Sequence, residues 1–313
     1  MATPALILAP LRGVTLLEFR ICLARHFPGF DLAYSPFVPT AAGTRFRLSM
    51  LRDVMPADNA GAIPLVPQTI GKSPEDFATF LRALKDIGYG RCDLNAGCPW
   101  PMIVKRGRGA GLLKSPDVLF AMLDAGCAEM PGGISLKARL GIDSPTLLPE
   151  LMERLNAYPL AALTIHCRTA RQMYGGDPDI ETFAECLAAA KMPVIYNGDI
   201  STPEDIARIS ARFPALAGIM VGRGAVRDPS IAMRAKGAFD GNLREALMVF
   251  ARDYSAMNRE RLFGPASFLG RMKEFWSYFK DSFANGEEIW KAIRVSRTYA
   301  EYDAILADAG RFR

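Results

Sequence analysis

A cysteine in the segment Asp93-Leu94-Asn95-Ala96-Gly97-Cys98-Pro99 is the strongest candidate in this chain for acid catalysis. Asn95 closes a short apolar run, and Cys98 follows it on a Gly-Cys-Pro turn. A thiol on such a turn is expected to be exposed, which distinguishes it from the buried structural cysteines that are more common. We therefore predict that Cys98 donates a proton to a substrate.

Basic residues occupy one face of two further apolar runs. Alternation along a strand places Ser135, Lys137 and Arg139 on one side of the run 133–141. The same spacing aligns three residues of the next run: Thr164, His166 and Arg168. Cations that face an interior are costly to bury unless an anion lies beside them. The pattern predicts an anionic ligand, and the alternative is a pair of solvent-facing basic strands.

Glycine-rich ends of the last two runs predict a phosphate site. One run ends in Asn197-Gly198-Asp199 and the next in Gly222-Arg223-Gly224, ahead of a helix expected to start near Asp228-Pro229. Free backbone amides together with the Arg223 guanidinium suit the phosphate site that barrels form after strands seven and eight. No Gly-x-Gly-x-x-Gly follows an apolar run, so a Rossmann dinucleotide site is not expected.

Two further strand ends suit a planar ligand. Ala9-Pro10-Leu11 opens a tight turn whose backbone amides can meet a flat ring, and the Gln68 amide can pair with an imide edge, although a capped loop explains Gln68 equally well. With Lys137 beside its electron-rich edge, a phosphorylated planar cofactor suggests FMN. Reduced flavin can deliver hydride to one carbon of an activated double bond while Cys98 protonates the other carbon. The C5=C6 bond of uracil is a bond of this kind.

Eight short apolar runs position these residues: 5–10, 30–36, 64–71, 91–97, 133–141, 161–169, 193–200 and 216–225. Helix-like segments with Ser, Thr or Pro starts lie between most of them, for example at 73–87, 115–128 and 201–212. Strands that alternate with helices predict an α/β fold, a closed (β/α)8 TIM barrel over residues 1–242. A doubly wound open sheet is the alternative.

Residues 243–313 lack strand patterns and predict a second domain, an all-α helical bundle. Within it the segment 271–280 interleaves cations with aromatic residues, a composition suited to phosphate contacts and base stacking. At helical spacing, however, Phe275, Trp276 and Phe279 favour a buried stripe.

Composition narrows the class of protein. The chain has 313 residues, a net charge of +5 and six cysteines without a Cys-x-x-Cys pair, and with two histidines it predicts no metal site. No apolar run approaches the roughly 18 residues of a membrane span, and the short apolar start lacks the features of a signal peptide. We expect a reduced, cytoplasmic protein that is monomeric and binds no membrane.

The motifs together resemble those of the tRNA-dihydrouridine synthases over nearly the whole chain. The matching segments are Ala9 to Thr15 with Leu11 in place of Met, Gln68 and Gly71, Asp93 to Pro99, Lys137-x-Arg139, His166 to Thr169 with Gln172, Tyr174 and Gly176, Asn197-Gly198-Asp199, and Gly222-Arg223-Gly224. Most of these motifs are weak alone, and their combination is specific.

The resemblance implies that FMN is held by Ala9, Pro10, Leu11, Gln68, Asn95, Lys137, His166, Asn197, Gly198, Asp199, Gly222 and Arg223. It implies that hydride reaches C6 of a uridine in the tRNA D-loop while Cys98 gives its proton to C5, with NADPH as the reductant. It also implies that the helical domain binds tRNA, and the expected substrate contacts are Arg139, Arg168, Lys105, Arg271 and Lys273. The segment 271–278 resembles the bacterial C-type branch, which modifies uridine 16.

Two departures from the family pattern affect RNA positioning. Trp100-Pro101 replaces the usual Ser-Lys after Cys98-Pro99, and Ser35-Pro36-Phe37 replaces a Thr-Glu or Ser-Glu segment. The cations clustered just beyond, Lys105, Arg106 and Arg108, offer a substitute RNA contact, or form a solvated loop. Two other functions remain alternatives: a flavin barrel that reduces a free small molecule, and a tRNA-binding protein without catalysis.

Overall fold

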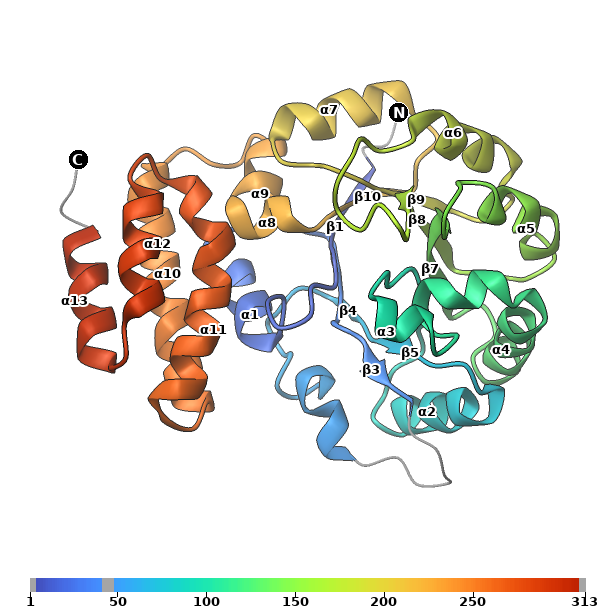
Figure 1. The fold of residues 1–313 in the computed structure, drawn as a ribbon, viewed down its shortest axis with the longest axis horizontal. Coiled ribbons are helices and arrows are strands. Elements are labelled where there is room, and N and C mark those ends of the chain that lie inside the picture. The colour runs from blue at the N-terminus through green and yellow to red at the C-terminus, as the bar shows by residue number, and fades with distance from the viewer. Residues whose placement is uncertain (1–3, 41–47, 310–313) are drawn as a thin grey trace.

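The sheet is a closed barrel of parallel strands in a computed structural model that describes residues 4–40 and 48–309 (Figure 1). Its ten strands are β1 Ala5–Leu8, β2 Leu32–Tyr34, β3 Val38–Pro39, β4 Leu65–Val66, β5 Gln68–Ile70, β6 Cys92–Ala96, β7 Ile134–Gly141, β8 Ala162–Thr169, β9 Val194–Asn197 and β10 Gly218–Val221. Their order in the sheet is β3-β5-β6-β7-β8-β9-β10-β1-β2-β4.

The run predicted at 64–71 is divided into β4 and β5, whereas the run predicted at 30–36 contains β2 alone and β3 follows beyond its end. The pairs β2 with β4 and β3 with β5 join the same two segments, 32–39 and 65–70. Proline supplies no N–H to a ladder, which explains breaks at Pro36 and Pro67. Since β2 and β3 belong to one segment, β4 and β5 to the next, and β1 pairs with both β2 and β10, the ring of segments closes. The predicted barrel is confirmed and the open sheet is wrong.

Helices cover the outside of the barrel. They are α1 Leu17–His26, α2 Pro74–Asp86, α3 Pro101–Val104, α4 Pro116–Glu129, α5 Leu147–Leu155, α6 Ile180–Ala189, α7 Pro203–Arg212, α8 Arg223–Arg227 and α9 Ile231–Ala235, with 3-10 helices η1 Leu48–Val54 and η2 Gly109–Lys114. The three helices expected from their starts are confirmed. Ser73 caps α2 and Thr202 forms a capping box on α7.

The helix expected near Asp228-Pro229 begins earlier. Gly222 ends the last strand segment and α8 starts directly at Arg223, so Pro229 lies between two short helices. The turn of a helix can begin at Arg223 because Gly224 approaches the backbone closely: an added Cβ at Gly224 would lie 2.1 Å from the carbonyl oxygen of Ile200. The phosphate loop predicted at Gly222-Arg223-Gly224 is therefore part of a helical turn.

Strand alternation divides the core into two layers. Inside the barrel lies a small apolar cluster of Ile7, Ala9, Tyr34, Val66, Ala162, Ile195 and Met220. The opposite faces of the strands pack against the surrounding helices in a much larger cluster. Buried polar side chains such as Gln68, Asp93 and Ser135 share the barrel interior with this cluster.

The C-terminal part of the chain is helical, as predicted from 243 onwards. Its elements are α10 Leu243–Arg261, α11 Gly264–Phe279, η3 Lys280–Ser282, α12 Gly286–Val295 and α13 Tyr299–Ala309. Figure 1 shows these helices as a layer beside the barrel, next to α1 and α8. No helix in the described ranges is both long and apolar enough to cross a membrane.

Aromatic rings join the two parts of the chain. Phe19 of α1 meets Phe250 with ring centroids 5.7 Å apart and Tyr254 at 5.8 Å. Phe275, Trp276 and Phe279 are fully buried, so the aromatic stripe of α11 is core and the base-stacking interpretation of that segment is wrong. The division into domains 1–242 and 243–313 stays a prediction, because the two parts share one hydrophobic core.

Candidate active site

A cavity of about 450 Å³ opens at the carboxyl ends of the strands, where barrels of this kind hold their chemistry. It is lined by nearly all the predicted site residues: Ala9, Pro10, Leu11, Asn95, Cys98, Lys137, Arg139, His166, Arg168, Asn197, Gly198, Asp199, Gly222 and Arg223. Strand register explains the grouping, since Asn95 pairs with Lys137 across β6 and β7, and His166 pairs with Asn197 across β8 and β9.

The Cys98 turn is fixed through its backbone. The Asn95 Oδ1 atom accepts the N–H groups of Gly97 at 3.0 Å and Cys98 at 2.8 Å, and the Cys98 carbonyl accepts the Ala110 N–H at 3.0 Å. Gly109 has a φ of +56°, and a Cβ there would lie 2.9 Å from the Cys98 Cβ. This close approach requires glycine.

Cys98 is more enclosed than the sequence suggested, with 9% of its surface exposed. Burial raises the pKa of the Cys98 thiol, and the nearby Arg139 and Arg12 only partly oppose this effect. The side chain is therefore a protonated thiol at neutral pH. That protonation state suits a proton donor better than a nucleophile.

A chain of hydrogen bonds inside the barrel sets the orientation of Asn95. Asp93 accepts from the Ser135 hydroxyl at 2.7 Å and from the Gln68 Nε2 at 2.8 Å. Gln68 Oε1 in turn accepts from Asn95 Nδ2 at 2.8 Å. An ionised carboxylate only accepts hydrogen bonds, so Asp93 directs the Gln68 amino group toward itself and the Asn95 oxygen toward the Cys98 turn.

We expect Asp93→Ala to lower the rate of product formation about tenfold, because an unpaired buried Gln68 amide costs roughly 1–3 kcal/mol and can reverse the Asn95 amide. Asp93→Asn is the matched control. Its oxygen can still accept from Gln68 while the Ser135 hydroxyl turns to accept from its amino group. Single-turnover rates measure the effect, and equal losses in both variants contradict this role.

Lys137 and Arg139 both face the cavity, so the alternative of solvent-facing basic strands is wrong for β7. The Lys137 Nζ atom donates to Asn197 Oδ1 at 2.8 Å, and Arg139 donates to the carbonyls of Gly97 at 2.9 Å and Thr169 at 2.8 Å. Burial and then the neighbouring Arg139 lower the pKa of Lys137 to about 8. The two hydrogen bonds of Arg139, to the Gly97 and Thr169 carbonyls, tie the Cys98 turn to the end of β8.

This pKa predicts a pH dependence of ligand binding in the protein without cofactor. Lys137 is protonated below pH of about 8 and neutral above it, so the affinity for an anionic cofactor such as FMN should weaken as the pH rises through this value. Fluorescence titrations with FMN between pH 7 and 9.5 measure the change. Lys137→Met should bind more weakly and with no break near pH 8, and a flat wild-type profile contradicts the prediction.

Asp199 organises the guanidinium groups at the other side of the cavity. It forms ion pairs with Arg168 and, at 3.0 Å, with Arg223. Burial opposes ionisation of Asp199, but the hydrogen bond and charge of Arg168 outweigh this effect and lower its pKa. The His166 pKa lies well below its usual range because of burial and the charges of Arg139, Lys137, Arg168 and Arg223. His166 is thus a neutral imidazole.

Two of the predicted residues have their polar groups bonded within the protein. Gln68 is fully buried and outside the cavity lining, and its contact with a cofactor stays a prediction. Arg168 is also buried, and its hydrogen bonds go to Asp199 and to the carbonyls of Gly175 and Gly176. Arg168 thus lines the cavity and also holds the loop at Gly175 and Gly176, and its contact with RNA stays a prediction.

The cations predicted to contact tRNA differ in their exposure to solvent and in their bonds to other residues. Lys105 is exposed just beyond α3, as is Arg106. Lys273 donates to the Ser296 carbonyl at 2.8 Å, and Arg271 is half-buried near Tyr254. Only the first two match the expectation of accessible cations. Arg227 of α8 also lines the cavity, and no strand pattern pointed to it.

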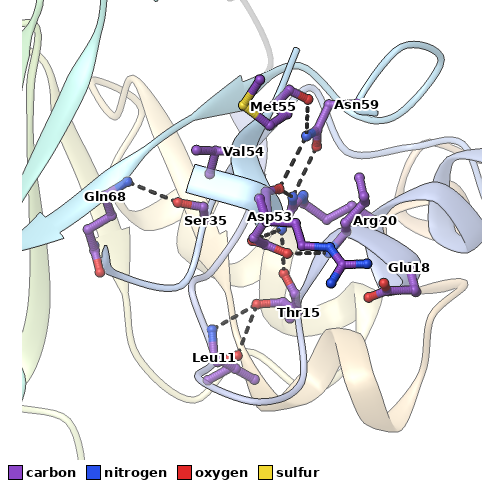
Figure 2. Close-up of polar contacts among 12 residues, drawn as sticks. Leu11, Thr15, Glu18, Arg20, Ser35, Asp53, Val54, Met55, Asn59 and Gln68 are labelled. Atoms are coloured by element: carbon purple, nitrogen blue, oxygen red, sulfur yellow. Dashed lines mark hydrogen bonds and ion pairs between the residues drawn. The ribbon is translucent and has the colours of Figure 1, made fainter. Parts of the chain in front are cut away.

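A buried ion-pair network holds the loop after β1, which lines the cavity (Figure 2). Thr15 donates through its hydroxyl to the Ala9 carbonyl at 3.0 Å and accepts the Leu11 N–H at 2.8 Å. Arg20, which is fully buried, donates to the Thr15 carbonyl at 2.9 Å and to the Asp53 carboxylate at 3.0 Å. Asn59 accepts from the same guanidinium at 3.0 Å. The turn that lines the cavity is thus fastened to α1 and to the segment after η1.

Solved structures with this fold include morphinone reductase, with a TM-score of 0.56 and 13% identity over 76% of this chain and 87% of that chain. Morphinone reductase in complex with tetrahydroNAD gives a TM-score of 0.53 at 12% identity, covering 76% and 88% of the two chains. Identity this low establishes the fold alone. The fold and the cavity define a (β/α)8 barrel with a cationic site at the carboxyl ends of its strands.

The family model for dihydrouridine synthase (Dus) matches residues 7–303. The chain belongs to the dihydrouridine synthase family and is an enzyme of tRNA modification. It is 30% identical over 311 residues to a tRNA-dihydrouridine(16) synthase of Cupriavidus necator, covering 96% of each chain. It is also 33% identical over 229 residues to a probable tRNA-dihydrouridine synthase of Rhodobacter capsulatus, covering 72% of this chain and 69% of the relative. The resemblance drawn from the motifs is confirmed.

Proposed function

We propose that this enzyme reduces the C5=C6 bond of a uridine in the tRNA D-loop, with FMN as cofactor and NADPH as reductant. The observation that carries the proposal is a protonated thiol, Cys98, at the wall of a cationic cavity. Hydride reaches C6 and the Cys98 proton reaches C5, so both carbons become saturated and dihydrouridine results. NADPH supplies the electron pair.

The chemistry of the cavity fits a flavin mononucleotide. Its volume lies in the range of cofactor sites. Its charged side chains are six cations and one carboxylate: Arg12, Lys137, Arg139, Arg168, Arg223, Arg227 and Asp199. A strongly positive cavity suits a ligand with a phosphate. When bound, FMN supplies the hydride.

The polar residues of the cavity then each have a specific role. Lys137 and Asn197, already bonded to each other, offer a cation and an amide to the cofactor, and the neutral His166 offers a ring nitrogen. Arg223 binds the phosphate while Asp199 holds its guanidinium in place. Asn95 and Arg139 fix the backbone of the Cys98 turn, so that the thiol proton lies where C5 of the uracil enters.

We also propose uridine 16 as the target, supported by the relative from Cupriavidus necator that carries this position in its name and aligns over 96% of both chains. Exposed Lys105 and Arg106 beside the cavity suit the phosphates of an RNA that reaches the site. The helical region 243–309 supplies a second surface beside the barrel for the body of the tRNA.

Two measurements test the proposal. Purified protein should show the absorption spectrum of bound flavin, and the cofactor released on denaturation should be FMN. Dihydrouridine mapping should then find position 16 modified in tRNA from cells that carry the gene and unmodified in cells without it. A protein that takes up no FMN, or an unchanged dihydrouridine map, contradicts the proposal. Modification at another position contradicts the choice of uridine 16 alone.

A further inference from the structure

Trp100 is an exposed aromatic residue at the edge of the cavity. Its side chain is 58% exposed although it lines the cavity and lies two residues after Cys98 in the chain. Two successive Cα steps limit the distance between these residues to about 7 Å. Because Trp100 lines the cavity, its exposed ring presents a flat aromatic face to any substrate that enters there.

The backbone around Trp100 is rigid. Pro99 precedes it and Pro101 follows it, so the backbone has little freedom on either side. The Trp100 carbonyl accepts the N–H groups of Ile103 at 2.8 Å and Val104 at 3.0 Å. Gly111 packs so closely on α3 that a Cβ there would lie 2.6 Å from the Val104 carbonyl oxygen. The backbone of Trp100 is therefore held in place before any ligand arrives, which reduces the entropy lost on binding.

The surroundings of Trp100 suit a nucleic acid. Arg12 is exposed on the cavity lining, and Lys105 and Arg106 are exposed at the end of α3. A flat aromatic ring among exposed cations is the arrangement with which proteins bind single-stranded RNA, because each base stacks while the phosphates meet the cations. A protein partner would place apolar side chains against these cations, which is less favourable.

We propose that Trp100 is a stacking platform for a nucleobase next to the uridine that enters the cavity. This inference rests on the proposed function. It gives the departure at Trp100-Pro101 a role: the chain has an aromatic ring for a base in the position where the resemblance expects the polar Ser-Lys pair. Trp100 is then a specificity-determining residue that acts on substrate binding, and the proton transfer from Cys98 does not depend on it.

The test compares variants of the FMN-loaded enzyme on an unmodified tRNA transcript. Trp100→Ala should raise the KM for tRNA about tenfold, as expected for the loss of one stacked base, with kcat within about twofold. Trp100→Phe should keep most of the affinity, because a ring remains. Met102→Ala is the matched control, since Met102 is 66% exposed on the same helix but outside the cavity lining, and it should behave like the wild type.

Salt dependence separates stacking from charge. Trp100→Ala should shift the KM equally at all salt concentrations, whereas Lys105→Ala should reduce the slope of log KM against log salt. Binding of the transcript to Cys98→Ala enzyme should also quench tryptophan fluorescence, and Trp100→Phe in that background should remove the quenching. The other two tryptophans, Trp276 and Trp290, are core and half-buried, respectively.

The outcomes distinguish the two proposals. An unchanged KM in Trp100→Ala, or a loss of affinity in Trp100→Phe as large as in Trp100→Ala, overturns the stacking role while wild-type activity on tRNA still supports the proposed function. A wild-type enzyme that makes no dihydrouridine overturns the proposed function, and with it the assignment of Trp100. Unaltered FMN content and flavin reduction by NADPH in every variant show that the fold and cofactor site are intact.

Discussion

Replacing Cys98 by alanine should lower the rate of dihydrouridine formation about 100- to 10,000-fold, the usual contribution of a positioned general acid. The thiol is the proton-bearing group on the Cys98 turn, and its raised pKa keeps the proton in place at neutral pH. Transient kinetics should resolve the loss in the oxidation of reduced flavin by tRNA, while flavin reduction by NADPH proceeds at the wild-type rate.

The control for this variant is Cys127→Ala. Cys127 is a half-buried thiol on α4, away from the cavity lining, so its removal should leave both half-reactions unchanged. Cys98→Ser should recover little activity, because a serine hydroxyl is a much weaker acid than a thiol. If Cys98→Ala retains the wild-type rate of flavin oxidation by tRNA, a different residue protonates C5 and the assignment of Cys98 is wrong.

Deleting residues 243–313 should abolish folding of the barrel. The deletion would expose the faces of α1 and α8 that helices α10 and α11 cover, including the fully buried Phe19. It would also remove Arg261, whose Nε lies 2.6 Å from a carboxylate oxygen of the buried Glu18. The Glu18 carboxylate would then lack its ion-pair partner. Soluble yield and circular dichroism of the truncated chain measure the outcome.

A point variant tests the same interface in the full chain. Phe250→Ala should destabilise the protein by about 3–5 kcal/mol, the usual cost of removing a buried phenyl ring. The ring of Phe250 packs on those of Phe19 and Phe27, with centroids 5.7 Å and 5.8 Å away. Val249→Ala, at an exposed position of the same helix, should change the stability little. A soluble truncated barrel that binds FMN would show that the two regions fold independently.

Much of the fold follows from sequence periodicity. All eight runs are strands or strand pairs of the barrel, because alternation and flanking turn residues are local signals. The strand ends also predicted most of the cavity lining, since parallel strands bring their carboxyl ends to one edge. The breaks at Pro36 and Pro67 are visible in the sequence too, although proline alone does not show that the run continues beyond it.

The sequence could not show which polar side chains bond to other groups of the protein. Gln68 was expected to meet a ligand, yet its amide lies between Asp93 and Asn95. Arg168 was expected to meet RNA, yet it holds two glycine carbonyls and Asp199. Strand alternation tells which face a residue is on, but the choice between a ligand and a protein partner depends on neighbours far along the chain.

The way in which the Cys98 turn is fixed leaves the exposed side chains of the neighbouring helix α3 free to vary. Its anchors are backbone atoms and glycines: the Cys98 carbonyl with Ala110, the close approach of Gly109, and Gly111 against Val104. Exposed side chains between these anchors, such as Trp100 and Lys105, make none of these contacts. Evolution can therefore rewrite the RNA-facing surface of this segment without moving the acid, and a designer seeking altered substrate choice can begin there.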